Sequence, residues 1–168
     1  DIPVAEFEQP VYGTSKEFSI TAGETTYVGD LVCTLLQCKV TVSYSDEFLA
    51  SVTGAGKATV EVTAGYPLEY VLNANGTYDQ SAGYFEVEGS TMTVVFSGNI
   101  EGKSQKMTKS FTNIAPKQWR QIKFIKKQPT IEQGGATFDI VIEQYVSDET
   151  LNEDITANEA IIGDDPDA

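Results

Sequence analysis

Apolar and polar residues alternate along most of this 168-residue chain, and this alternation limits its fold more than any other feature. A period of two is typical of β-strands with one buried face, and turn signals recur every ~8–12 residues. Because no stretch of about 12 residues has the helical period, we expect at most one short helix, near residues 46–51. We therefore predict an all-β fold, specifically an antiparallel Greek-key β-sandwich. The expected strands cover residues 17–22, 39–45, 58–64, 68–72, 84–87, 92–96, 106–111, 120–126 and 137–146.

Two of these strands show how we expect the faces of the sheets to divide. In residues 17–22, Phe18 and Ile20 alternate with Ser and Thr, and in residues 39–45, Val40, Val42 and Tyr44 share one side. Val, Ile, Thr, Tyr and Phe are the residues that a half-buried pleated surface accommodates. We expect both segments to bury their apolar side in the sandwich.

The length predicts one domain, which we place at residues 1–162, with residues 1–15 as either a first strand or an extended arm. Residues 163–168 are expected to form an acidic C-terminal linker or tail. Residues 148–168 carry eight acids and no bases, yet Ile155, Ile161 and Ile162 favour a last strand within residues 155–162. The sequence opens at Asp1 without a leader-like segment. We therefore expect either that a leader has been removed or that the chain is a module of a longer protein.

The charge balance and the missing histidines exclude several classes of function. The chain has 25 acidic and 11 basic residues, a net charge of −14. Such an excess of acid argues against nucleic acid and against anionic membranes as partners. No histidine is present, which removes Ser-His and Cys-His nucleophile pairs and zinc sites that contain histidine. We predict a non-enzymatic protein without a cofactor or a metal. Cys33 and Cys38 form either a disulfide or two small buried thiols.

Basic residues are concentrated in one segment. Residues 103–131 carry eight bases and no acid, and we expect two strands there, joined at residues 113–118. One interpretation is an edge ribbon that lysines protect against aggregation. The other is a cationic face for an acidic partner or for the acidic tail of a neighbouring copy. The candidate interaction face comprises Lys103, Lys106, Lys109, Arg120, Lys123 and Lys127.

Several aromatic residues lie near expected strand ends and loops. Their rings could stack on the apolar faces of sugars, or they could lie half-buried at corners of the sandwich with only a polar atom in water. The candidate ligand-binding aromatics are Trp119, Tyr66, Tyr70, Tyr78 and Tyr84.

Five short motifs carry a resemblance to a known family. They are FEQPVYG at residues 7–13, FSITAG at 18–23, VC followed after four residues by CKVTVSYSDEF at 32–48, GYF at 83–85 and VSD at 146–148. Together they resemble an uncharacterised domain family of surface lipoproteins from Gram-negative gut anaerobes, similar in style to fimbrillin-like adhesins. The resemblance implies a secreted β-sandwich on the extracellular face of the outer membrane and brings no catalytic residues. The lipidated cysteine of such lipoproteins is absent, since Cys33 lies too deep, so the anchor is expected outside this chain.

From these observations we predict a non-enzymatic cell-surface module in adhesion or pilus-like assembly. It would act by edge-strand or surface contacts with a protein or glycan at the cell surface, self-association included. The candidate edges are the basic ribbon, residues 106–127, and the terminal strand, residues 155–162. The alternatives are a glycan-binding module of a polysaccharide-capture system and an inert spacer in a larger surface lipoprotein.

Overall fold

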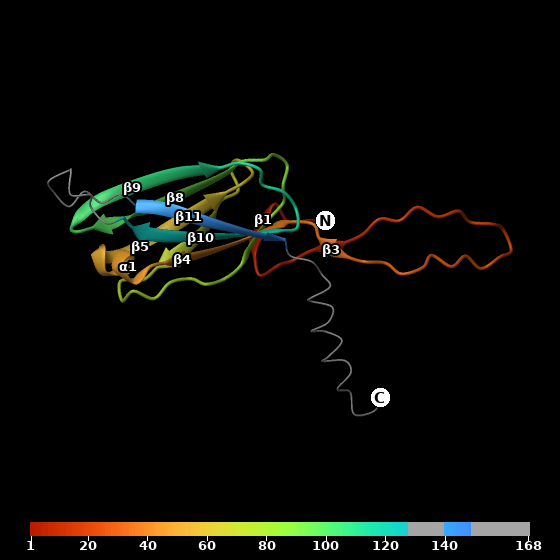
Figure 1. The fold of residues 1–168 in the computed structure, drawn as a ribbon, viewed down its shortest axis with the longest axis horizontal. Helices are drawn as coiled ribbons and strands as arrows, with labels where there is room; N and C mark the ends of the chain where they lie inside the picture. Colours follow the sequence, from red (N-terminus) through yellow and green to blue (C-terminus); the bar gives the residue numbers. More distant parts are fainter. Residues whose placement is uncertain (128–139, 149–168) are drawn as a thin grey trace, which may run out of the picture.

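A computed structural model describes residues 1–127 and the backbone of residues 140–148, and it contains two facing β-sheets (Figure 1). The five-stranded sheet has the order β1-β7-β4-β10-β11, and the four-stranded sheet has the order β6-β5-β8-β9. A separate pair, β2-β3, lies beside them. The elements are β1 (Ala5–Phe7), β2 (Tyr12–Gly13), β3 (Thr34–Leu35), β4 (Cys38–Tyr44), α1 (Asp46–Ser51), β5 (Val52–Glu61), β6 (Leu68–Leu72), β7 (Gly83–Phe85), β8 (Met92–Ile100), β9 (Lys103–Phe111), β10 (Gln118–Lys126) and β11 (Ile140–Asp148). The predicted all-β sandwich is confirmed.

The core follows from the predicted alternation. Along β4, Val40, Val42 and Tyr44 are buried while the residues between them are partly exposed. Tyr44 stacks on Phe124 with ring centroids 5.1 Å apart, and Phe96 approaches both rings from the opposite sheet. Aromatic contacts of this kind add to the free energy gained by burying apolar surface. The two sheets are therefore joined through a cluster of packed rings.

The predicted short helix forms at the expected place. Ser45 caps α1, since its side chain accepts a hydrogen bond from the Phe48 N–H at 3.2 Å. The negative charges of Asp46 and Glu47 in the first turn stabilise the helix by interacting with the positive end of its dipole. Phe48 then points into the core, where its ring lies 5.1 Å from that of Phe96. One helical turn thus closes one end of the sandwich.

One strand pair departs from the predicted antiparallel pattern. β10 runs parallel to β4, with Ile122 opposite Val42 and Phe124 opposite Tyr44. Its other neighbour, β11, is antiparallel to it. A parallel pair requires a long crossover between its strands, and here the crossover contains α1, the whole four-stranded sheet and β7. Sequence periodicity shows which residues share a face but not the direction of the neighbouring strand.

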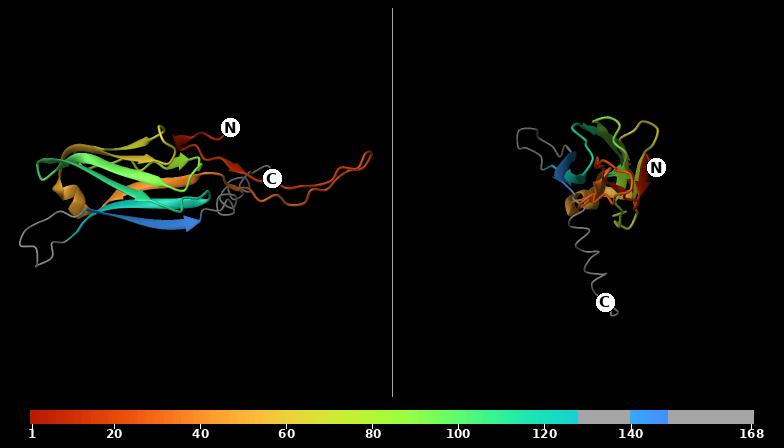
Figure 2. Two further views of the ribbon diagram at one scale, coloured as in Figure 1. Left: turned by 90° about the horizontal axis from the view of Figure 1, so that it is seen from above. Right: turned by 90° about the vertical axis from the view of Figure 1, so that its right-hand side faces the viewer.

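Residues 14–33, which we call the arm, leave the body as two limbs that run side by side far from both sheets (Figures 1 and 2). The prediction of a buried strand at residues 17–22 is wrong, because no strand is assigned there and Phe18 and Ile20 are exposed. Residues 1–15 contain the strands β1 and β2. The expected strand at 155–162 and the acidic tail at 163–168 lie outside the described residues.

Candidate protein-interaction site

The root of the arm is fixed to the body by a buried glutamine that sequence analysis did not single out. The Gln37 Oε1 atom accepts a hydrogen bond from the Val11 N–H at 2.8 Å, and its Nε2 atom donates to the Gln9 carbonyl at 3.3 Å. Gln37 is fully buried, so both side-chain groups lie away from water, and breaking these bonds would leave them unsatisfied. The root is thus a defined structure rather than a loose loop end.

Close packing supports the same root. A Cβ atom added at Gly13 would lie 2.8 Å from Leu36 Cδ1, closer than ordinary van der Waals contact. β2 and β3 pair here, with Gly13 opposite Thr34 and Tyr12 opposite Leu35. The only hint in the sequence was a polar residue, Gln37, directly before an alternating strand.

The tip of the arm is a tight turn. The Glu24 N–H donates a hydrogen bond to the Thr21 carbonyl at 3.2 Å, and Gly23 has a φ of 81°. A positive φ at the third position of a four-residue turn favours glycine. Inside the arm, and among the described residues, this is the one backbone-to-backbone hydrogen bond that forms.

The two limbs between tip and root do not match in length. Continuing the pairing of Thr21 with Glu24 outward would place Gly13 opposite Val32, but Gly13 pairs with Thr34. Between the tip and the root, the return side of the arm is therefore two residues longer than the outgoing side. The return limb, residues 24–32, lies on this longer side, and Gly29 within it has a φ of 83°. A register shift of this kind interrupts a β-ladder. The Ser19 carbonyl accepts a long hydrogen bond from the Thr26 hydroxyl at 3.5 Å, and backbone groups elsewhere along the two limbs remain available for another chain.

The arm also carries most of the large exposed apolar side chains in the described part of the protein. Ile20 is 78% exposed and Tyr27 is 87% exposed. Single exposed apolar residues are common on protein surfaces, but several together on one projecting element mark an interaction site. The others in the arm are Phe18, Leu31 and Val32.

The predicted basic ribbon is not one edge. β9 lies at the edge of the four-stranded sheet and, among the described residues, pairs only with β8. β10 lies in the other sheet, between β4 and β11. The prediction of a continuous edge over residues 106–127 is therefore wrong, because the two strands cross from one sheet to the other instead of forming a hairpin.

Arg120 does not belong to a cationic surface either. The residue is buried, and its Nη2 atom donates to the carbonyls of Thr112 and Asn113 at 3.2 and 2.6 Å. Its Nε atom donates to Gln118 Oε1 at 3.0 Å. Arg120 thus holds the loop between β9 and β10, where burial of a cation is offset by hydrogen bonds.

The other candidate cations divide between the two sheets. Lys103, Lys106 and Lys109 are exposed along β9, whereas Lys123 lies partly buried in β10 and Lys127 is exposed beyond it. The structure therefore brings together three of the six predicted residues. They form the β9 edge, a strand of nine residues that carries three lysines and no acid.

The five candidate aromatics do not form one exposed platform. Tyr70 and Tyr84 are buried, which agrees with the alternative of rings packed in the sandwich and not with a sugar platform, and Tyr70 donates a hydrogen bond to the Val40 carbonyl at 2.7 Å. Tyr78 packs edge-on against the Tyr44 ring at 4.9 Å. Tyr70 and Tyr84 lie in the middle of β6 and β7, and Tyr78 forms an isolated bridge with Leu72, so the strands themselves turn these rings inward. Tyr66 is the exposed member of the set.

Trp119 is partly buried and already has protein partners. Its indole N–H donates to Thr41 Oγ1 at 2.9 Å, and the Lys39 Nζ atom lies 4.4 Å from the ring centroid. A cation at this distance over an indole ring is attracted to it. Lys39 therefore covers one of the ring faces that a sugar would need.

The two thiols are not joined. Cys33 is partly exposed at the root of the arm and Cys38 is buried at the start of β4. Burial raises the pKa of the Cys38 thiol to about 12, an effect that the nearby Arg120 cation partly opposes. Cys38 is thus an inert core residue at neutral pH.

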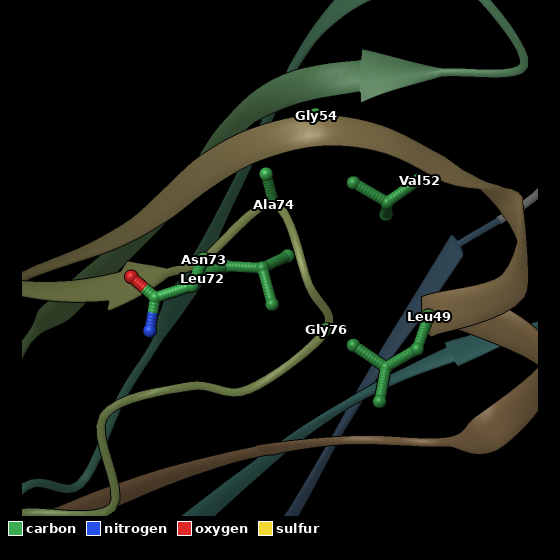
Figure 3. A pocket seen from close by; sticks show the side chains of 7 residues that line it. All are labelled: Leu49, Val52, Gly54, Leu72, Asn73, Ala74 and Gly76. Carbon is green, nitrogen blue, oxygen red and sulfur yellow. The ribbon is translucent and has the colours of Figure 1, made fainter.

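A cavity of about 30 Å³ opens beside α1, with Leu49, Val52 and Leu72 on its apolar side and Asn73 on its polar side (Figure 3). It is large enough for about one or two water molecules. Within residues 1–127, no group of three or more Cys, Asp or Glu side chains gathers as a metal site. No helix in the described ranges is long and apolar enough to cross a membrane.

Comparison with known proteins gives a family. A search among curated proteins finds no match to this chain. A solved structure named as a "putative cell adhesion protein" from Bacteroides eggerthii is similar at 10% identity and a TM-score of 0.38. The match covers 70% of this chain and 57% of that one, so this chain spans little more than half of that protein. A family model described as "Domain of unknown function (DUF4493)" matches residues 1–158. The chain belongs to the DUF4493 family.

Proposed function

We propose that this domain is a non-enzymatic contact module of the cell surface that acts in adhesion or pilus-like assembly. The observation that carries the proposal is the arm, which presents exposed apolar side chains on a firmly rooted, projecting ribbon. The fimbrillin-like motifs in the sequence support a place on the extracellular face of the outer membrane, with the anchor outside this chain.

The arm has two properties that a contact element needs. Burying an exposed apolar side chain gains roughly 1.5–3 kcal/mol, and Phe18, Ile20 and Tyr27 are available for such burial. The backbone of the limbs can also pair with a strand of the partner, which is the basis of β-strand addition. Because the root is held by Gln37, part of the ordering cost of binding is met before the partner arrives.

The test measures adhesion of beads that carry the whole chain. Beads with the natural sequence should adhere to one another or to an epithelial cell layer, and a Phe18→Ser/Ile20→Ser/Tyr27→Ser variant should lose this adhesion. The control is Tyr66→Ser/Val71→Ser, which removes exposed apolar residues outside the arm. Equal adhesion by the arm variant and the natural chain would overturn the proposal.

Glycan capture and simple spacing are the alternative functions. Affinity electrophoresis through gels that contain plant and host polysaccharides separates them, with Trp119→Ala as the variant. Retardation that depends on Trp119 would favour glycan capture. Unchanged migration, together with beads that do not adhere, would favour a spacer.

A further inference from the structure

We propose that residues 149–162, which we call the tail segment, bind along the β9 edge of the same molecule and add a fifth strand to the four-stranded sheet. The inference goes beyond the proposed contact function, which concerns the arm. The tail segment lies outside the described residues. Four observations support its binding here: the open edge of β9, the place where β11 ends, the length of the tail segment, and its composition.

The β9 edge is open in the described part of the protein. Within residues 1–127 and 140–148, β9 pairs only with β8. Seven of its nine residues are exposed, whereas Met107 is half-buried and Phe111 is buried. An edge strand of this length presents a row of unpaired N–H and C=O groups, which proteins usually cover or protect. The β9 edge is therefore a surface on which another strand can pair.

β11 lies on the same side of the sandwich as β9. Arg120 in β10 donates hydrogen bonds to the carbonyls of Thr112 and Asn113, directly after β9. At the other end of β10, the Lys126 Nζ atom lies 3.9 Å from Glu101 Oε1, directly before β9. β11 pairs with β10 on the side away from β4. The outer strand of the five-stranded sheet is therefore next to the open edge of the other sheet.

The chain leaves β11 at the end of the molecule that this pairing requires. Asp148, the last residue of β11, lies opposite Gln118, and β11 points toward the root of the arm (Figure 1). β9 runs in the same direction, because it begins near α1, where the Glu101 N–H donates to the Ser51 carbonyl at 2.8 Å. A segment that turns back after Asp148 is therefore antiparallel to β9. It continues the antiparallel pattern of the four-stranded sheet.

The tail segment is long enough to reach β9 and cover it. Facing sheets lie about 10 Å apart and an extended chain spans about 3.3 Å per residue, so about three or four residues cross between the sheets. The rest of the tail segment, about ten residues at this rise, can cover the nine residues of β9. The match to the family model extends to residue 158. This extension beyond β11 supports a place for residues 149–158 within the domain.

The charges of the tail segment and of β9 are opposite. The tail segment has no glycine, proline or base, and its four acids are Glu149, Glu153, Asp154 and Glu159. Lys103 and Lys106 are exposed along β9, which has no acid. Opposite charges on neighbouring strands stabilise their pairing. A strand without acids would bring no compensating charge to these lysines, so the edge favours the tail segment over most other strands.

The apolar residues of the two segments also have the same spacing. Met107 and Phe111 lie four residues apart in β9, and Leu151 and Ile155 lie four residues apart in the tail segment. Residues four apart in a strand share one face. An antiparallel pairing that places Ile155 opposite Met107 therefore places Leu151 opposite Phe111. In this register the added strand would cover the part of Met107 that is still exposed and extend the core.

An edge that is closed within each molecule cannot pair with the sheet edge of another molecule. Edge-to-edge pairing is a common route to aggregation. With the β9 edge covered, copies of the domain at high local concentration would meet through the arm and not through this sheet. The tail segment would thus protect the body and leave the arm as the contact element.

The experiment measures hydrogen–deuterium exchange of the β9 amides in the full chain. In the natural chain, β9 should exchange about as slowly as β8, which has a neighbour on both sides. The tail variant Asp154→Lys/Glu159→Lys and the edge variant Lys103→Glu/Lys106→Glu should each exchange about tenfold faster in β9, the size expected when two exposed attractions become repulsions. A chain with both pairs of substitutions should recover slow exchange, because the two segments again have opposite charges.

The matched control is Asp164→Lys/Asp167→Lys, which changes the net charge as much as the tail variant does but lies beyond the tail segment. Its β9 amides should exchange like those of the natural chain. The inference is overturned if β9 of the natural chain exchanges as fast as an unpaired segment, or if the combined variant does not recover. Protection of β9 that increases with protein concentration would assign the edge to a second copy and would also overturn it. Bead adhesion tests the arm separately, so either proposal can fail while the other stands.

Discussion

Strand β4 and the outgoing limb of the arm, residues 14–21, have the same sequence pattern and opposite surroundings. In β4, Val40 and Val42 are almost completely buried, whereas Phe18 and Ile20 in the arm are 54% and 78% exposed. Both segments alternate apolar and polar residues, and both are extended. The difference is that β4 has neighbours on both sides, β7 and β10, and a second sheet across its apolar face.

This contrast shows what alternation does and does not specify. A period of two indicates a strand with one apolar face, but the surface that covers that face comes from elsewhere in the chain or from another chain. The apolar face of β4 is covered by other strands of the same molecule. We propose that the apolar side chains of the arm are covered only when another molecule binds. The following experiments test this difference between the arm and β4.

The largest difference is expected when one apolar side chain is shortened in each region. Phe124→Ala removes a ring that stacks on Tyr44 in the core and should lower the free energy of unfolding by about 3–5 kcal/mol. Ile20→Ala in the arm should change it by less than about 0.5 kcal/mol. Urea denaturation measures both values. Equal losses would show that the arm packs against the body.

The next effect concerns alkaline pH. Burial raises the pKa of Cys38 from 9.0 to about 12, so the folded protein keeps this thiol protonated where the unfolded chain loses the proton. The stabilising contribution is complete below pH 9 and is lost as the pH rises toward 12, by about 1.4 kcal/mol per pH unit. A Cys38→Ala variant should show a flatter fall in stability over this window. A Cys38→Ala variant whose stability falls as steeply as that of the natural chain over this window would contradict the prediction.

Two buried tyrosines of the body should respond differently to loss of the hydroxyl group. Tyr70→Phe removes the hydrogen bond to the Val40 carbonyl and should cost about 1–2 kcal/mol. Tyr44→Phe removes a hydroxyl that has no partner among the described residues and should cost less than about 0.5 kcal/mol. Thermal unfolding of the two variants checks the order. A larger loss for Tyr44→Phe would contradict it.

Removing the whole arm should change the stability of the body only slightly. Replacing residues 15–32 by Asn-Gly would connect β2 and β3 with a tight hairpin, and the shorter loop should raise the free energy of unfolding by about 1 kcal/mol. The shortened protein should keep its far-ultraviolet circular dichroism and lose bead adhesion. Unfolding of the shortened chain would mean that the arm is part of the body.

Much of the body could be predicted from the sequence. The strands β4, β8 and β10 and the helix α1 follow from local signals: alternation, turn residues and the Ser45 cap. The β9 lysines were identified from their charge. Gln37 and Arg120 were not assigned their structural roles, because each bonds to carbonyl or amide groups that only the folded chain brings near.

Local signals in the sequence are enough to show that this chain is built of strands with one short helix, because periodicity, capping and turn chemistry act between close neighbours in the chain. The folded chain was needed to show which alternating segments are buried, that β10 lies parallel to β4, and that the basic segment divides between two sheets. These features depend on pairing between residues far apart in sequence. A segment such as residues 17–22 has the same local preference for the extended state with or without a partner strand.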